Sequence, residues 1–215
     1  MAVGVGTSCD RDSQTAQSPT EPLNPDPSAS PAPPAPPPPP EGAFLAQLSP
    51  QQVSQLNSLG IDVVVPGVVP SSFTVAEMRI DQGETGPGYL IVYRDAAAQC
   101  FAVEFAAEGI GDPSATQNRL PVQPPLFGGQ SYHLNYGEFT EPTMQAQFPG
   151  SNLYTDWLRG PSGAYRLIGA AYIKELFPTL ASCTDIPPEM AVSLVESFTV
   201  LTSEPMGDGE NFGLP

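Results

Sequence analysis

Residues 89–105, YLIVYRDAAAQCFAVEF, decide the fold class that this chain is expected to have. Two apolar runs, Tyr89–Tyr93 and Cys100–Phe105, flank the short segment Arg94–Gln99, and this pattern predicts a β-hairpin. Further short extended runs, separated by Gly and Pro turns, lie on both sides of it. Because consecutive strands joined by short turns pair antiparallel, we expect a meandering antiparallel sheet.

The other strands are read from the same alternation of apolar runs and turns. They are expected at Ile61–Val65, Phe73–Ile80 and Ser131–Tyr136, and a second hairpin is expected to pair Leu153–Leu158 with Ala164–Ile168 across Arg159–Gly163. The segment Gly109–Gly129 is rich in Pro and Gly, and it is expected to be a long loop.

A helix is expected before the sheet. Ser49, Pro50 and Gln52 stand in the order of an N-cap, a first-turn proline and a capping-box acceptor. Gly60 is the predicted end of this helix. The apolar residues on one side of it are Val53, Leu56 and Leu59.

A second helix is expected near the C-terminus. Asp185 is its predicted cap, and two prolines follow that suit a first helical turn. Its apolar stripe consists of Ala191, Leu194, Val195 and Phe198, and Phe198–Leu201 is predicted to be a closing strand. The expected fold class is therefore α+β, a curved antiparallel meander sheet with an N-terminal and a C-terminal helix packed on one face.

The distribution of proline divides the chain. Residues 10–42 hold 12 of the 28 prolines, and this composition predicts a disordered, polyproline II-like tether of up to about 100 Å. Residues 1–9 are interpreted as the remnant of a signal peptide and lipobox. Residues 43–203 are expected to form one globular domain, and residues 204–215 a flexible acidic tail.

The charge of the chain excludes some classes of partner. Seven Lys and Arg residues stand against 23 Asp and Glu residues, which gives a net charge of -16. A protein this acidic repels phosphate backbones and anionic lipid, so we expect no nucleic-acid partner and no polybasic membrane patch. The same surface suits a basic protein partner.

No run of 18 apolar residues occurs, so no membrane-spanning helix is expected.

Cys9 follows a run of small residues and opens directly onto the proline-rich segment. The stretch Val5–Asp10 resembles a bacterial lipobox, although Gly6 stands where that motif has leucine. In lipoproteins the cysteine of this motif is lipidated, so the resemblance implies that Cys9 anchors the chain to a membrane. The alternative is a free thiol in an N-terminal tail.

The other two cysteines lie within the expected domain. Cys100 opens a predicted strand, and Cys183 lies in the turn before the last helix. In an oxidising compartment such a pair forms a disulfide, and we predict the bridge Cys100–Cys183. The alternative is two buried, reduced cysteines that act as small apolar side chains. No CxxC motif or neighbouring histidine points to a zinc site, and no metal or cofactor is expected.

His133 is the single histidine, and therefore the candidate general base of any hydrolase. No G-x-S-x-G or S-x-x-K motif accompanies it. The alternation of its strand places it with Ser131 and Asn135, away from Tyr132 and Leu134, so we interpret it as a solvated side chain rather than a catalytic one. Trp157 is expected to be a core residue.

Several packing motifs resemble a family of extracytoplasmic domains of unknown function from bacterial envelope proteins and anti-sigma-factor regions. The resemblance rests on Pro70–Phe73, Tyr89–Tyr93, Trp157 before a Gly turn, Tyr165–Gly169 and Leu194–Ser197. These domains are similar to the curved sheets of lipoprotein carriers and sigma-factor regulators. The resemblance implies a fold and an envelope location, and it carries no catalytic residue.

The function expected from these features is that of a membrane-tethered extracytoplasmic binding or accessory domain without catalysis. A concave sheet face would hold a peptide or an apolar ligand. Two alternatives stay open. One is a secreted hydrolase that uses His133 with a nearby Ser and Asp, and the other is a periplasmic or luminal subunit whose acidic surface docks a basic protein.

Overall fold

The computed structural model describes residues 45–84, 86–108, 110–128 and 130–202. The helical elements are η1 Leu45–Gln47, α1 Pro50–Asn57, η2 Pro125–Phe127, α2 Pro142–Gln147, α3 Ala170–Leu176, η3 Pro178–Leu180 and α4 Pro188–Glu196. The strands are β1 Val64–Pro66, β2 Thr74–Gly83, β3 Gly86–Arg94, β4 Gln99–Ala106, β5 Thr116–Val122, β6 Tyr132–Phe139, β7 Asn152–Thr155, β8 Leu158–Gly160, β9 Gly163–Ile168, β10 Thr184–Asp185 and β11 Phe198–Val200.

Several sequence predictions lie outside the described residues. They are the lipobox with Cys9, the tether over 10–42 and the acidic tail over 204–215. Within the described part of the chain, no helix is long and apolar enough to cross a bilayer.

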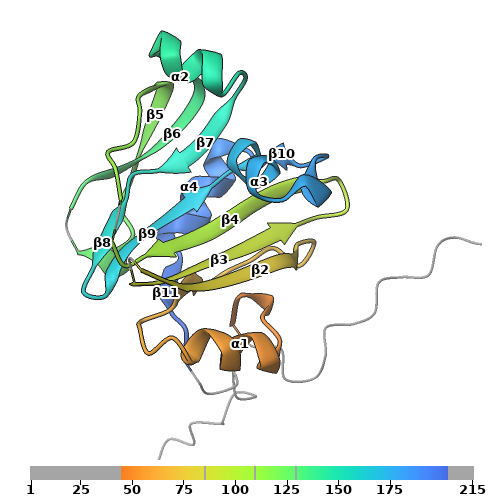
Figure 1. The fold of residues 1–215 in the computed structure, drawn as a ribbon, viewed down its shortest axis with the longest axis vertical. Coiled ribbons are helices and arrows are strands. Elements are labelled where there is room, and N and C mark those ends of the chain that lie inside the picture. Colours follow the sequence, from red (N-terminus) through yellow and green to blue (C-terminus); the bar gives the residue numbers. More distant parts are fainter. Residues whose placement is uncertain (1–44, 85, 109, 129, 203–215) are drawn as a thin grey trace, which may run out of the picture. The chain divides into compact units, whose positions relative to one another are not determined.

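A nine-stranded sheet forms the centre of the domain (Figure 1). Seven strands follow in the order β2-β3-β4-β9-β7-β6-β5, β8 pairs with β9, and the short β10 pairs with β4 as the parallel member. The predicted α+β class with a large antiparallel sheet is confirmed. The order departs from a simple meander, because β9 lies between β4 and β7 and joins two three-stranded meanders.

The hairpin of β3 and β4 forms as expected. Tyr93 lies opposite Phe101, and the register continues without a break from Gly88 to Arg94. Asp95 closes the turn, since its Oδ1 accepts a hydrogen bond of 2.7 Å from the backbone N–H of Gln99. This side-chain bond replaces part of the ladder in the turn and aligns the two strands.

The segment Gly109–Gly129 is not the long loop that its composition predicts. It contains β5, which pairs with β6 at the edge of the sheet, and the turn η2. Pro121 is compatible with β5 because an edge strand has one side without ladder hydrogen bonds. The alternation that marks strands is missing here, since most of the β5 side chains are exposed and the buried ones stand at its two ends.

The second hairpin is tighter than expected. Leu158–Gly160 of β8 pairs with the start of β9 across a two-residue turn. The preceding strand β7 ends at Thr155 and pairs mainly with β6, and it meets β9 only where Tyr154 lies opposite Ile168. The prediction of one strand over Leu153–Leu158 is therefore wrong. The break falls at the two residues between β7 and β8.

The predicted first helix is confirmed by the capping of α1. The Ser49 side chain accepts from the Gln52 N–H, and the Gln52 side chain accepts in return from the Ser49 N–H.

The predicted cap of the last helix is wrong. The residue before α4 is Pro187, without a side-chain cap, and Asp185 instead accepts a hydrogen bond of 2.6 Å from the N–H of Ala170 at the start of α3. The expected closing strand forms as β11, which pairs with β1 in a separate two-stranded sheet.

The middle strands β3 and β4 of the sheet are buried on both sides. Tyr89, Ile91 and Tyr93 of β3 belong to the larger buried cluster, which also contains side chains of α1 and α4. We call this side the α1/α4 face. Leu90 and Val92 point the other way and belong to a smaller cluster with residues of α3. We call this side the α3 face.

The predicted disulfide is present. Cys100 at the start of β4 is bonded to Cys183 before β10, with 5.5 Å between the two Cα atoms. Both cysteines are buried in the cluster on the α3 face. The bridge therefore ties the segment that follows α3 to the middle of the sheet.

Candidate functional site

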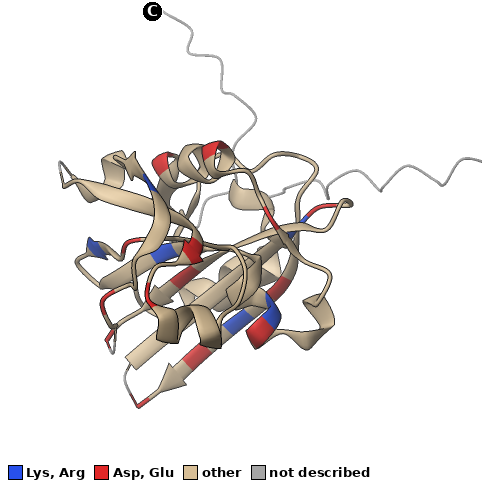
Figure 2. Ribbon diagram, turned by 90° about the horizontal axis from the view of Figure 1, so that it is seen from above, with Lys and Arg blue, Asp and Glu red and all other residues tan. Residues whose placement is uncertain are grey.

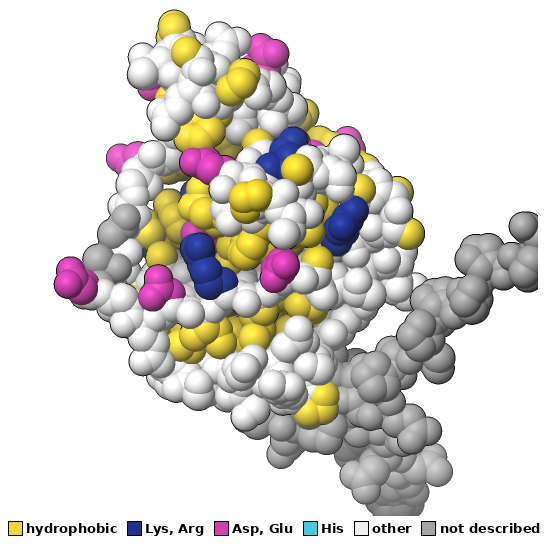
Figure 3. Space-filling model, turned by 45° about the vertical axis from the view of Figure 1, so that its right-hand side comes forward, with side chains coloured by type: hydrophobic (Ala, Val, Ile, Leu, Met, Phe, Trp, Pro, Cys, Tyr) yellow, Lys and Arg dark blue, Asp and Glu magenta, His cyan; other side chains and the backbone are white. Residues whose placement is uncertain are grey.

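A groove of about 270 Å³ opens on the α3 face. Its floor is formed by residues of β6, β7 and β9, where the two halves of the sheet meet, and its walls by α2, α3 and the segment Asp112–Ser114. The space-filling view shows hydrophobic side chains at this surface, interrupted by charged ones (Figure 3). The groove combines an apolar interior with a few polar groups, as small-ligand sites usually do.

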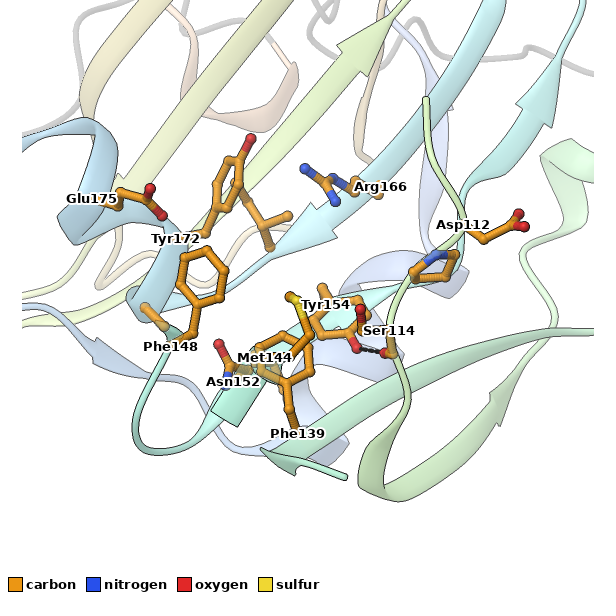
Figure 4. A pocket seen from close by; sticks show the side chains of 14 residues that line it. Asp112, Ser114, Phe139, Met144, Phe148, Asn152, Tyr154, Arg166, Tyr172 and Glu175 are labelled. Carbon is orange, nitrogen blue, oxygen red and sulfur yellow. Dashed lines mark hydrogen bonds between the residues drawn. The ribbon is translucent and has the colours of Figure 1, made fainter. Parts of the chain in front are cut away.

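The interior of the groove is aromatic and aliphatic (Figure 4). Phe139 lies between two other rings, with centroid distances of 6.1 Å to Phe148 and 6.0 Å to Tyr154. Met144 of α2 lines the same wall. Phe148 and Met144 are only half-buried, so this apolar surface is accessible from solvent.

Arg166 is the cation in the lining of the groove. Its guanidinium lies 4.1 Å from the ring centroid of Trp157 and 4.9 Å from that of Tyr172, so it is held between two aromatic faces. Its Nε donates to Glu104, which lies directly opposite across β4 and β9. The two side chains are 17% and 15% exposed, so the charge of Arg166 is compensated and its plane is fixed.

Two carboxylates stand at the mouth of the groove. Asp112 belongs to the segment after β4, and Glu175 to α3; both are exposed, and they lie at opposite ends of the groove in Figure 4. The ion pairs among the described residues include neither of them. The charged residues at the mouth of the lining are therefore acidic, whereas Arg166, the one cation of the lining, is paired with Glu104; Arg79 lies outside the lining but is close enough to act on Tyr172.

Two tyrosines of the groove have shifted ionisation. Burial raises the pKa of Tyr154 to about 12, with a smaller contribution from the charge of Asp156. Burial also raises the pKa of Tyr172, assisted by Glu104 and opposed by Arg166. Both phenols are therefore neutral hydrogen-bonding groups at physiological pH. The Tyr154 hydroxyl donates to the backbone carbonyl of Ser114 and so fixes the segment that forms one wall (Figure 4).

His133 is not the solvated side chain that the sequence predicts. The alternation was correct, since His133 and Asn135 share a face, but both bind Asp156. Asp156 Oδ2 accepts from the His133 backbone N–H at 2.9 Å and lies 3.1 Å from Nδ1, and Asp156 Oδ1 accepts from the Asn135 amide at 2.9 Å. Arg119 adds a contact of 3.3 Å. The His133 side chain is 34% exposed.

Asp156 is thus saturated with donors, and it immediately precedes Trp157. The expectation that Trp157 is a core residue is wrong, because it is half-buried and stacks on Arg166. The backbone alternation of a continuous strand does not apply at this position, since β7 has already ended. Four polar contacts on Asp156 therefore hold the segment that carries Trp157 beside the groove.

Comparison of the chain with protein-family models, curated proteins and solved structures finds no match. Among the described residues, no three His, Cys, Asp or Glu side chains gather in a way that could hold a metal ion.

Sequence reasoning identified some of these residues but not the site. The disulfide pair and His133 were singled out, and the structure places Cys100 and Cys183 in the cluster next to the groove. Arg166, Glu104 and Tyr172 were not singled out. Glu104 and Arg166 meet only because β4 and β9 are neighbours, and 62 residues separate them in the chain.

Proposed function

We propose that this chain is a membrane-tethered, extracytoplasmic binding domain without catalysis, and that the groove on the α3 face holds an apolar group of its ligand. The observation that carries the proposal is the accessible apolar interior of the groove beside an oriented Arg166. A preformed apolar surface with a few convergent polar groups binds without large rearrangement.

The arrangement of Arg166 supports binding. A guanidinium held between two rings and a carboxylate loses little freedom when a ligand accepts a hydrogen bond from it. Its Nε is used by Glu104, and its two terminal amino groups make no hydrogen bond to the described residues. The Arg166 side chain lines the groove and is 17% exposed, so it can offer a donor to a ligand acceptor there.

The envelope location and the lipid anchor at Cys9 form the second half of the proposal. The bridge Cys100–Cys183 supports an oxidising compartment, because structural disulfides persist outside the reducing cytosol. The curved sheet with α1 and α4 on one face belongs to the proposal as well. Side chains of both helices lie in the same buried cluster, which supports it.

Binding in the groove is tested with N-phenyl-1-naphthylamine, a neutral apolar dye. We expect dye emission to rise on binding, with energy transfer from Trp157, the single tryptophan of the chain. Ala171 lines the groove, and Ala171→Phe should abolish binding because the ring fills the space. The matched control is Ala146→Phe on the exposed side of α2, which should bind the dye as the parent does. Equal binding by Ala171→Phe would refute the proposed site.

The anchor is tested by metabolic labelling with a radioactive fatty acid. The gene is expressed with its own upstream DNA, and the parent is compared with Cys9→Ser. Label in the parent but not in the variant is the expected outcome. Absence of label from both would remove the tether from the proposal while leaving the groove untouched.

The hydrolase alternative is favoured by one observation, the contact of His133 Nδ1 with Asp156. An aspartate in that position orients a histidine in many hydrolases. Here the same carboxylate also binds Asn135 and two further donors, which suits a structural role. Hydrolysis of p-nitrophenyl acetate that is lost in a folded His133→Ala protein would establish the alternative and refute the non-catalytic assignment.

A further inference from the structure

The size of the groove limits what can occupy it. Pockets that enclose a drug-sized ligand have volumes of about 300 to 1,000 Å³. The groove measures about 270 Å³ and is open to solvent through half-buried side chains such as Phe148. It therefore stands at the lower end of this range and has room for one apolar side chain of a larger partner.

The charges around the groove determine which residues of the partner can flank that apolar side chain. Glu104 already compensates Arg166, whereas Asp112 and Glu175 at the rim belong to no ion pair of the described residues. An anionic head group would meet two carboxylates and a neutralised cation. A cation on either side of the apolar group would meet a carboxylate.

The charge of the wider surface also favours a positively charged partner. The described residues include fifteen Asp or Glu and six Lys or Arg, and the acidic positions lie on β2, β4, β6, α3, β10 and α4 and in several loops (Figure 2). Such a field attracts basic partners and accelerates their encounter. The charge of the domain and the charge of the rim therefore act in the same direction.

Arg166 adds a donor for the backbone of the partner. Its side chain lines the groove beside the apolar interior and is 17% exposed, so it can donate to a main-chain carbonyl next to the buried side chain. A neutral carbonyl accepts this hydrogen bond without facing the repulsion that the rim carboxylates exert on an anion. A peptide supplies such a carbonyl at every residue.

We propose that the occupant of the groove is a basic segment of another protein, with an aromatic or branched apolar side chain in the groove and Lys or Arg on both sides of it. This inference rests on the proposed binding function and names its partner class. The apolar anchor contacts Phe139 and Phe148, and the flanking cations face Asp112 and Glu175.

The test uses three capped peptides, with the central sequences Lys-Phe-Lys, Glu-Phe-Glu and Lys-Ala-Lys, titrated into the isotopically labelled full chain and followed by NMR. We expect Lys-Phe-Lys to shift amides of α3 and β7, and to bind at least about fivefold more tightly than Glu-Phe-Glu, as two solvent-exposed charge contacts allow. Lys-Ala-Lys should bind more weakly because it lacks the anchor.

A double variant separates the rim from the overall field. Asp112→Asn with Glu175→Gln should reduce the preference for Lys-Phe-Lys by about fivefold. The control double variant, Asp81→Asn with Glu189→Gln, changes the net charge equally at exposed positions away from the groove lining, and it should leave most of the preference intact.

The outcomes distinguish this inference from the proposed function. Dye binding in the groove without a preference for the basic peptide overturns the inference and leaves the proposed function standing. Tighter binding of dodecanoate than of Lys-Phe-Lys also overturns it, because a small amphiphile would then be the occupant. Failure of dye, dodecanoate and peptides alike would refute both.

Discussion

The two faces of the central sheet differ in how completely they are covered. Among the described residues, the α1/α4 face holds 28 buried apolar side chains, whereas the α3 face holds 11. On the first face two helices and a two-stranded sheet contribute to one continuous cluster. On the second, the short helices α2 and α3 leave the groove open. We infer that one face provides most of the stability and that the other is available for binding.

The buried polar groups show the same difference. On the α1/α4 face the Tyr89 hydroxyl donates to the Val64 carbonyl and accepts from the Val64 N–H, each at 2.8 Å, and the Tyr165 hydroxyl donates to the Asp62 carbonyl at 2.7 Å. These bonds attach the segment around β1 to the sheet. On the α3 face, the Arg166 side chain lines the groove and can offer a donor there.

The largest expected effect concerns the disulfide of the α3 face. The bridge closes a loop with a sequence separation of 83 residues. The chain-entropy model assigns such a loop about 4 kcal/mol. We expect the double variant Cys100→Ala with Cys183→Ala to lose about that much free energy of unfolding in urea titrations. Amides of α3 should exchange faster than those of α1. Unchanged stability would mean that the buried cluster on the α3 face does not depend on the disulfide.

Next comes a pair of aromatic truncations, one on each face. Phe101 is fully buried and packs against Phe73 and Tyr93, so Phe101→Ala should cost about 4 kcal/mol in free energy of unfolding. Phe148 is half-buried at the groove, and Phe148→Ala should cost about 1 kcal/mol. Chemical denaturation measures both. Equal costs would contradict the division of roles between the faces.

A smaller effect is expected from two hydroxyl deletions within the α1/α4 face. Tyr89→Phe removes the bridge to Val64 and should cost about 2 kcal/mol. Tyr93 is the internal control, because its buried hydroxyl has no hydrogen-bond partner among the described residues. Tyr93→Phe should therefore be neutral or stabilising in the same denaturation assay. A loss of stability in Tyr93→Phe would reveal a partner for that hydroxyl.

The smallest effect is a pH dependence at Asp185. Burial raises the pKa of this carboxyl above its ordinary value of 3.8, while the bond from Ala170 opposes the shift. Between the ordinary and the raised pKa the folded chain binds more protons than the unfolded chain, so the free energy of unfolding falls as pH rises through this window. Asp185→Asn removes the titration. The stability of the variant relative to the parent should rise with pH, as urea midpoints measured at several pH values will show. A constant difference would rule out the coupling.

Local signals explain what the sequence predicted well. The capping box of α1 involves residues within one turn, and the hairpin of β3 and β4 needs only two apolar runs and a short connection. Where signals were weak or misleading, prediction failed. The strand β5 lacks alternation and contains Pro121, and α3 has seven residues, too few for a clear periodicity.

The candidate site was the least predictable part of the molecule. Asp185 has the sequence context of a cap for α4, but the fold brings it to the first residue of α3. Trp157 is a residue of a type that usually lies in the core, but β7 ends before it and its ring lies against Arg166. In both cases the partner lies on an element that local pattern cannot place.

By itself the sequence determined the α+β class, the capped first helix, the central hairpin and a cysteine pair at bonding positions, because each depends on residue type and short-range spacing. Tertiary structure alone decided that β9 lies between β4 and β7. That placement sets Arg166 opposite Glu104, brings Trp157 and Tyr172 onto its two sides and opens the groove between the halves of the sheet. Strand order is a long-range choice, made by the packing of both faces together, and no short stretch of the chain encodes it.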